Sequence, residues 1–360
     1  MKELLNSSLK SIFGVVLGFS LGLLVCHFAG ESPLKVMKVL FESSFGSGYD
    51  FGMTLFYTAP LILTGLAVAI PFRAGLFNIG GEGQLTIGAL AAAWAGVIGK
   101  DIHSPVLAIL FASSFAFIAG GMWGSIAGVL KAKRGSHEVI TTIMMNFIAA
   151  GVTSYLTLYV IKDPDSSQAE SILLPAAFHL KPFAIFNGAP MGELIFVLIA
   201  ILLIVHYWLK NSVLGYEMKA VGENELAAET YGISKQKSWI FSMFLAGGFA
   251  GLVGVVEVLG NSHRFKIGFS ADYGFVGIAV ALLARGNIIG ILPSAFLFGV
   301  LQKGAGSLDL ETEKVTRDLT YIIQGLIILG VAADGLFDES WLTRFFKARV
   351  MKKKALGGNV

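Results

Sequence analysis

Long apolar runs separated by short polar segments make up most of the chain. The first, residues 11–30, contains a single ionisable side chain, His27. At about 1.5 Å per residue, a helix of this length spans about 30 Å, which is the thickness of a bilayer's hydrocarbon core. The run is predicted to be a retained membrane helix, because Val25 before Cys26 is bulkier than the residue that lipoprotein processing requires.

Further apolar runs repeat this pattern along the chain, so about ten membrane spans are expected. The expected spans after the first are 51–70, a run that ends near residue 98, 105–130, 139–161, 194–209, 239–259, 273–284, 288–300 and 319–333. The runs at 273–284 and 288–300 are short, and counting both as crossings places the two ends of the chain on the same side. The fold class predicted from this pattern is an all-α, polytopic membrane helical bundle.

Composition agrees with this pattern. The chain is 55% hydrophobic and 14% charged, with a mean hydropathy of +0.73, whereas soluble proteins average about 25% charged residues. No charge-rich or low-complexity linker separates a second domain, so residues 1–360 are predicted to form a single transmembrane domain. A net charge of +3 spread over the ends of apolar runs provides no concentrated basic face, which excludes nucleic-acid binding.

The charge bias orients the expected spans. Most of the 27 Lys and Arg fall in segments on the side of the N-terminus, including five in the tail between residues 347 and 354. The positive-inside rule therefore predicts that both termini are cytoplasmic. On this topology the polar segment 210–238 is cytoplasmic, and the proline-containing segment 162–190 is an extracytoplasmic loop.

Several kinds of chemistry lack the residues they require. A phosphate-binding loop of the form G-x-x-x-x-G-K-[ST] is absent, so any ATP hydrolysis belongs to another chain. The six histidines have no metal-ligand spacing, and the single cysteine cannot form an intrachain disulfide. No catalytic residue, metal or cofactor is predicted, and the chain is not expected to be an enzyme.

The cytoplasmic segment 210–238 contains one short stretch that favours a helix. Residues 224–231 are rich in Glu and Ala, with Asn224 as a candidate N-cap and Gly232 as a C-terminal stop. A helix this short is marginal alone, so it is expected to be stabilised by docking on another surface. The alternative is an ordinary solvated loop.

A second notable stretch, residues 73–84, contains four glycines where a span should begin. A discontinuous helix of this kind exposes backbone groups that can face a solute. The alternative is close packing of small residues between helices, with Glu82 paired to Arg73.

Polar residues inside spans need a partner or a purpose. Thr142 and Asn146 are four residues apart, so they share a helix face that could line the path of a hydroxyl-rich solute. Arg285 is explained by anchoring of the topology. The candidate residues of the solute path are Asn78, Glu82, Gln84, Thr142, Asn146 and Asp272.

Four segments together carry a family likeness: residues 75–84, 138–146, 220–233 and 277–287. In this order they resemble the permease subunits of bacterial ABC importers for nucleosides and simple sugars, in the branch related to the branched-chain amino acid and ribose permeases. The likeness runs from about residue 51 to residue 333. Two positions depart from the family pattern: Ala284, where a second glycine is frequent, and Gly81.

The resemblance implies an importer in the bacterial cytoplasmic membrane. Its other parts would be a second permease subunit, of the same or a homologous chain, a cytoplasmic ATPase and an extracytoplasmic solute-binding lipoprotein. A small-molecule solute would pass between the lipid-embedded helices. The family's ATPase-coupling helix would correspond to Gly222, Glu223, Asn224, Ala227, Ala228, Tyr231 and Gly232. An ion-coupled secondary transporter that uses Glu82 or Asp272 is the alternative function.

Overall fold

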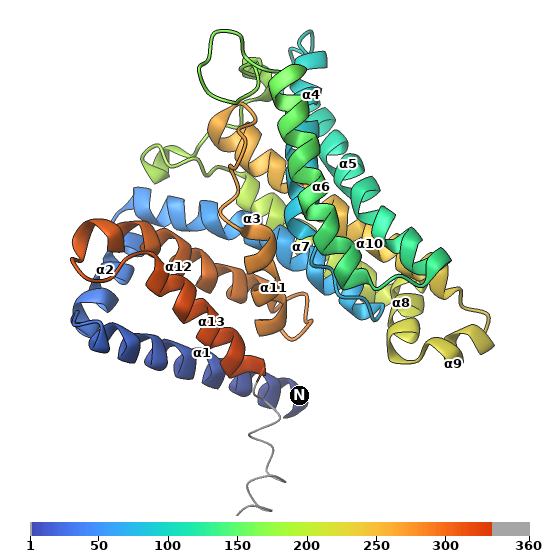
Figure 1. Cartoon of the computed structure of the whole chain (residues 1–360), viewed down its shortest axis with the longest axis horizontal. Helices are drawn as coiled ribbons and strands as arrows, with labels where there is room; N and C mark the ends of the chain where they lie inside the picture. Colours follow the sequence, from blue (N-terminus) through green and yellow to red (C-terminus); the bar gives the residue numbers. More distant parts are fainter. Residues whose placement is uncertain (1, 333–360) are drawn as a thin grey trace, which may run out of the picture.

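The computed structural model describes residues 2–332, and every regular element within that range is helical. The predicted location of the basic tail after residue 332 lies outside the described residues. The elements are α1 (Lys2–Phe28), α2 (Pro33–Phe45), α3 (Gly48–Arg73), α4 (Gly81–Ile98), α5 (Pro105–Arg134), α6 (Glu138–Tyr159), the 3₁₀ turns η1 (Ala176–Phe178) and η2 (Ala184–Phe186), α7 (Leu194–Asn211), α8 (Val213–Glu223), α9 (Glu225–Thr230), α10 (Lys235–Gly251), the π-helix η3 (Val255–Ser262), α11 (Tyr273–Leu283), α12 (Ile291–Glu311) and α13 (Asp318–Ala332) (Figure 1).

Six of the ten expected spans are helices long and apolar enough to cross a bilayer: α1, α3, α5, α6, α7 and the continuous stretch formed by α10 and η3. The other four are α4, α11, α12 and α13. They form helices at the expected places, but α11 and α13 are short. The described residues therefore show an all-helical multi-pass membrane protein with six clear spans.

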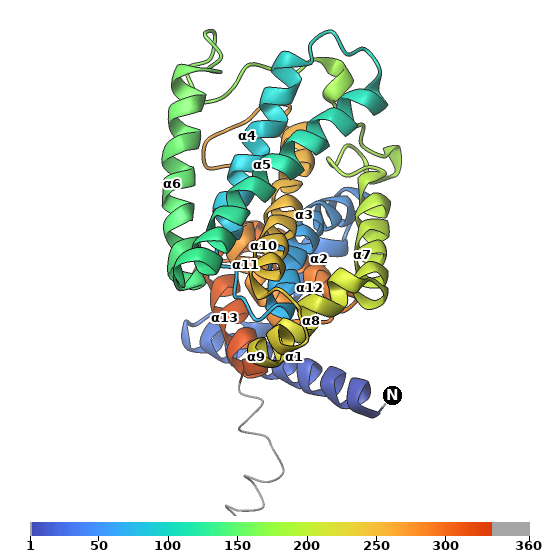
Figure 2. The ribbon, with the colours of Figure 1, turned by 90° about the vertical axis from the view of Figure 1, so that its right-hand side faces the viewer.

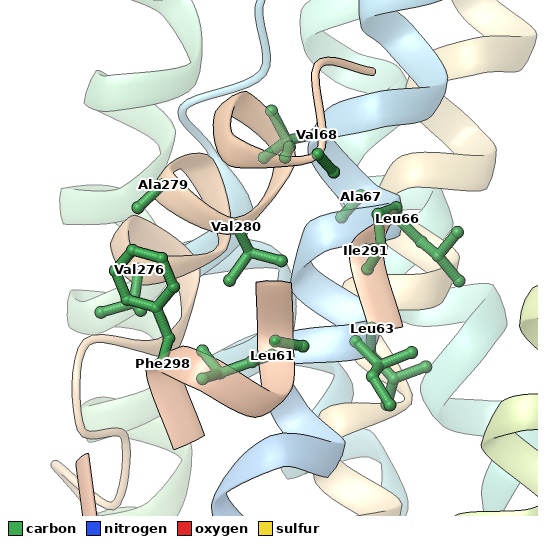
Figure 3. Close-up of a cluster of buried hydrophobic side chains, with 14 of the residues drawn as sticks. Leu61, Leu63, Leu66, Ala67, Val68, Val276, Ala279, Val280, Ile291 and Phe298 are labelled. Atoms are coloured by element: carbon green, nitrogen blue, oxygen red, sulfur yellow. The ribbon is translucent and has the colours of Figure 1, made fainter. Parts of the chain in front are cut away.

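Helix α3 lies at the centre of the bundle. In its most apolar 18-residue window 83% of the residues are buried, compared with 17% in α6. Leu61, Leu63 and Leu66 of α3 pack with Val280 of α11 and Phe298 of α12 (Figure 3). Such a helix, apolar around its whole circumference, is stable only inside other helices.

Glycines allow α5 and α10 to pack with their backbones in contact. A Cβ atom at Gly247 would lie 2.1 Å from the carbonyl oxygen of Gly120, and one at Gly251 would lie 2.3 Å from that of Ala116. Real side-chain atoms do not approach this closely, so these positions hold the two helices together only as glycine. Small residues at helix interfaces are the usual basis of helix association in a bilayer.

Two helices were not expected from the sequence. Helix α2 lies in the segment assigned as polar, and α8 lies in the cytoplasmic segment, of which only 224–231 was predicted to be helical. Both are amphipathic: α2 buries Val36, Val39 and Leu40, and α8 buries Met218 and Val221. Their apolar faces are too short to resemble a membrane span, which is why the search for long apolar runs missed them.

The two segments with a predicted side of the membrane lie at opposite ends of the molecule. The connection between α6 and α7, which contains η1 and η2, is at the top of Figures 1 and 2, and α9 is near the bottom in both views. Between them run α4, α5, α6 and α10. The bundle thus separates the segment 162–190 from the segment 210–238.

Candidate functional site

The chain is not helical between α3 and α4. Helix α3 ends at Arg73, just after Pro71, and Gly75 adopts a left-handed backbone with φ +74°, where a side chain would be strained. The segment 74–80, called the break from here on, runs through the protein until α4 begins at Gly81. Its free N–H and C=O groups must find partners inside the bundle.

Asn78 and Gln84, two of the predicted solute-path residues, are fully buried and bonded to each other. The Asn78 amide donates to Gln84 Oε1 over 2.9 Å, and the Gln84 amide donates to Asn78 Oδ1 over 3.1 Å. Asn78 also donates to the Ala67 carbonyl and accepts from the Gly80 N–H. The pair fixes the break against both flanking helices.

Thr142 and Asn146 do share a face of α6, and that face lies on the break. The Ile79 N–H donates to Thr142 Oγ1 over 3.3 Å, and Asn146 donates from Nδ2 to the Ile79 carbonyl over 2.9 Å. Asn146 Oδ1 accepts from the Gly83 N–H over 2.8 Å. Side chains of α6 therefore satisfy both backbone groups of Ile79 and the N–H of Gly83, whereas the N–H groups of residues 74–76 bond to the end of α3.

Glu82 reaches the first turn of α11. Its Oε2 accepts a 2.9 Å hydrogen bond from the Gly274 N–H, so a carboxylate lies at the positive end of that helix. The expected pairing of Glu82 with Arg73 is not among the ion pairs of the described residues, and Arg73 lies at the end of α3, before the break. Asp272 precedes α11 with a left-handed backbone (φ +58°) and an exposed side chain, and the described contacts give it no side-chain cap.

A cavity of about 240 Å³, lined mostly by apolar surface, is bordered by two of the predicted residues. It lies between α4, α6 and the 265–270 segment, and its polar lining consists of Glu82, Thr86, Asn146, Thr153, Ser154 and Ser270. Phe265, Ile267 and Phe269 supply apolar surface beside these groups, a combination that suits a solute with both an apolar face and hydroxyl groups. Asn78 and Gln84 are packed away from this cavity.

The predicted helix at 224–231 is present as α9. The Asn224 side chain accepts from the Ala227 N–H over 3.0 Å, and Gly232 adopts the left-handed backbone that ends the helix. Ala228 is buried against the bundle, whereas Leu226 and Tyr231 are 75% and 86% exposed. Lys235 holds the helix through ion pairs with Glu225 and Glu229.

Gly222, at the end of α8, contacts the start of the break directly. A Cβ atom there would lie 2.2 Å from the Arg73 carbonyl oxygen and 3.0 Å from the Gly75 nitrogen. Glu223, the next residue, is exposed and pairs with Lys219. The α8–α9 segment and the break, which lie far apart in the sequence, are thus in backbone contact.

At the opposite end, the 162–190 segment is fastened to the residues after η3 by polar contacts. Arg264 pairs with Glu170 and, at 3.3 Å, with Asp163, and the Ser171 N–H donates to the Phe265 carbonyl. Hydrogen bonding from Ser166, with the charge of Arg264, lowers the pKa of Glu170 below its ordinary value, although partial desolvation opposes the shift. Sequence analysis missed Arg264, whose position at the end of a span was the available signal.

A multi-pass helical bundle with a non-helical break after its central helix, a cavity bordered by polar side chains and a short helix projecting at one end is the architecture of a membrane transport subunit. The chain belongs to the family described as "Branched-chain amino acid transport system / permease component", whose model matches residues 51–332. It is therefore an ABC transporter permease and not an enzyme, which confirms the family resemblance. This family membership argues against the alternative class, an ion-coupled secondary transporter.

Three curated relatives are informative. The guanosine ABC transporter permease protein NupP of Bacillus subtilis is 37% identical, across 99% of this chain and 100% of that protein. The glucose ABC transporter permease protein TsgB13 of Haloferax volcanii is 33% identical, across 85% and 82%. The guanosine ABC transporter permease protein NupQ of Bacillus subtilis is 26% identical, across 69% of this chain and 79% of that protein.

Proposed function

We propose that this chain is one of the two membrane subunits of an importer that carries nucleosides, driven by a separate ATPase that docks on α9. The observation that carries the proposal is the backbone contact of Gly222 with Arg73 and Gly75. Through this contact, a force applied to α9 reaches the break, the non-helical segment between α3 and α4. Displacing the break would move Glu82 and Asn146 and so change the cavity that they line.

The exposed surface of α9 supports the docking of the ATPase. Leu226 and Tyr231 present apolar area to solvent, while Ala228 holds the helix on the bundle. On a segment outside the membrane, where lipid does not cover them, these two apolar side chains are the surface we propose for contact with the ATPase. Glu225 and Glu229 next to them add charge that basic groups on a partner could match.

The proposed topology has ten spans and both termini in the cytoplasm. The opposite positions of α9 and the 162–190 segment support it (Figures 1 and 2), as does the excess of Lys and Arg in the segments on the side of α9. On this topology the 162–190 segment faces outward, where a solute-binding lipoprotein would dock and release the solute. The membrane is the cytoplasmic membrane of a bacterium, and lipid surrounds the exposed faces of α1 and α6.

The second permease subunit is proposed to be a different chain. In Bacillus subtilis two guanosine permeases have separate names, and this chain is 37% identical to one and 26% identical to the other. An unlike partner of the second kind would complete the membrane portion. Nucleosides are the favoured solutes because identity to NupP covers the whole chain, and glucose is the other candidate because of TsgB13.

The test is a pair of leucine substitutions at the two ends of the molecule. Leu226→Asp places a charge on the proposed docking surface, and Leu310→Asp does the same at an exposed leucine near the end of α12 (87% exposed). Co-purification of the ATPase and ATP-driven guanosine uptake should be lost with Leu226→Asp and kept with Leu310→Asp. Equal retention of the ATPase by both variants would contradict docking on α9.

A further inference from the structure

Among the carboxylates of the described residues, Glu257 is the most deeply buried. The proposed transport cycle gives it no role. It is 5% exposed and lies in η3, five residues before the end of a long apolar span. A carboxylate within a membrane segment is costly and marks a functional site by default. π-helical turns are also frequent at functional sites.

The contacts of Glu257 place it at the first turn of α11. Tyr273 donates from its hydroxyl to Glu257 Oε1 over 2.9 Å, and Asn261 donates from Nδ2 to Oε2 over 3.3 Å. Tyr273 is also buried, but Asn261 is exposed. One of the two hydrogen-bond partners of the buried carboxylate is therefore an exposed side chain, that of Asn261.

The next residue of α11 is held by the carboxylate of the solute cavity. Tyr273 contacts Glu257, and the Gly274 N–H donates to Glu82 over 2.9 Å. A Cβ atom at Gly274 would lie 2.2 Å from the Glu82 nitrogen, so the starts of α4 and α11 touch through their backbones. Two carboxylates from different helices thus bind consecutive residues, and a shift of α11 would release both.

We infer that Glu257 is a second solute-contact residue, which exchanges the Tyr273 hydroxyl for hydroxyl groups of the solute when the start of α11 moves. The inference rests on the proposed function. The carboxylate accepts hydrogen bonds, as a sugar diol requires, and Asn261 at the surface supplies an amide donor and acceptor beside it. Glu82 and Glu257 would then bind the solute in succession.

The alternative role of Glu257 is structural: it would only hold η3 and α11 together through Tyr273. Two substitutions distinguish this role from solute contact by their effect on uptake. Glu257→Gln keeps the size of the side chain and an oxygen that accepts from Tyr273, but removes the charge. Tyr273→Phe removes the tie and leaves the carboxylate. Solute contact predicts that Glu257→Gln lowers guanosine uptake and Tyr273→Phe does not, whereas a structural tie predicts the reverse.

The assay is ATP-driven uptake of radiolabelled guanosine by the complete transporter in proteoliposomes. Glu257→Gln should lower uptake by roughly tenfold, the size expected when a hydrogen bond to a charged acceptor is replaced by one to a neutral acceptor, while ATP hydrolysis persists. Uptake within twofold of the parent, or a larger loss with Tyr273→Phe, overturns the inference. Absence of ATP-driven uptake in the unsubstituted assembly would instead contradict the proposed function.

Accessibility to a thiol reagent provides a measurement that does not depend on guanosine uptake by the variant. The chain has a single cysteine, so Cys26→Ser gives a cysteine-free background. In the assembled transporter, Glu257→Cys should react with a charged methanethiosulfonate during ATP turnover, and guanosine should slow that reaction. Ser242→Cys, at a fully buried position on α10, should stay unreactive. If position 257 is equally unreactive in the resting and the turning-over assembly, the inference is wrong.

Discussion

The segments at the two ends of the molecule are attached to the helical bundle by different kinds of contact. At the α8–α9 end, Gly222 lies against the Arg73 carbonyl with no side chain between them. At the other end, the 162–190 segment is attached through side-chain charges, with Arg264 between Asp163 and Glu170. A close backbone contact passes a displacement directly from one segment to the other, whereas an ion pair between flexible side chains can lengthen or change partner. The first arrangement suits transmission of force, and the second suits a surface that meets a delivery protein.

The largest expected effect comes from adding one methyl group at Gly222. Gly222→Ala forces α8 away from the break and overpacks the contact, at a cost of about 1–3 kcal/mol. Uptake should be lost while ATP hydrolysis continues, as measured in proteoliposomes. Gly325→Ala is the matched control, because a Cβ atom there meets nothing within 4 Å. Parent-level uptake with Gly222→Ala would remove the mechanical distinction between the two ends.

The hydrogen bonds of the break give the next largest effect. Asn78→Leu leaves the Ala67 carbonyl, the Gly80 N–H and the Gln84 amide without their partner, and each buried unsatisfied group costs about 1–3 kcal/mol. The thermal stability of the purified permease should fall clearly. Asn211→Ala, which removes a bond at an exposed position, serves as the control and should leave stability nearly unchanged. Equal melting temperatures for both variants would show that the break is not fixed by Asn78.

Acidification should affect the 162–190 end selectively. The lowered pKa of Glu170 means that its contribution to stability is complete above the ordinary carboxyl value, about 4.3. That contribution is lost as the pH falls through the lowered folded value. Protease cleavage within 162–190 should therefore increase below about pH 4, and Arg264→Gln should produce the same sensitivity at neutral pH. A cleavage rate independent of both changes would mean that charge does not hold this segment.

The smallest effect is expected from the cap of α9. Asn224→Ala removes the bond to the Ala227 N–H, at a cost of about 1 kcal/mol. Uptake should fall modestly because α9 frays while its docking surface remains. Ser47→Ala removes the corresponding cap of α3 at the other end and should lower uptake less. A greater loss with Ser47→Ala would reverse the assignment of the ends.

Local signals in the sequence predicted the parts of this structure that depend on neighbouring residues. The six clear spans follow from apolar length, and α9 follows from Asn224, a helix-favouring stretch and Gly232. The amphipathic helices α2 and α8 were missed because each buries only a few residues on one side. The helical periodicity on which such a prediction depends extends over too few turns there.

The partners of the candidate residues could not be predicted in the same way. Thr142 and Asn146 were correctly placed on one face, but nothing local indicates that this face meets Ile79 and Gly83. The contact of Gly222 with Arg73, and that of Glu257 with Tyr273, join segments that are distant in the chain or separated by an irregular loop. Such contacts depend on the packing of the whole bundle, which a single sequence does not specify.

The most direct test of the central claim is whether ATP binding to the ATPase docked on α9 changes the break. Phe77, half-buried within the break, can be replaced by cysteine in the Cys26→Ser background. Its reaction rate with a charged thiol reagent is then measured in the assembled transporter, without nucleotide and trapped with ATP and vanadate. The account predicts different rates in the two states, and no difference when Leu226→Asp is added. Identical rates in both states of an assembly that still transports guanosine would contradict it.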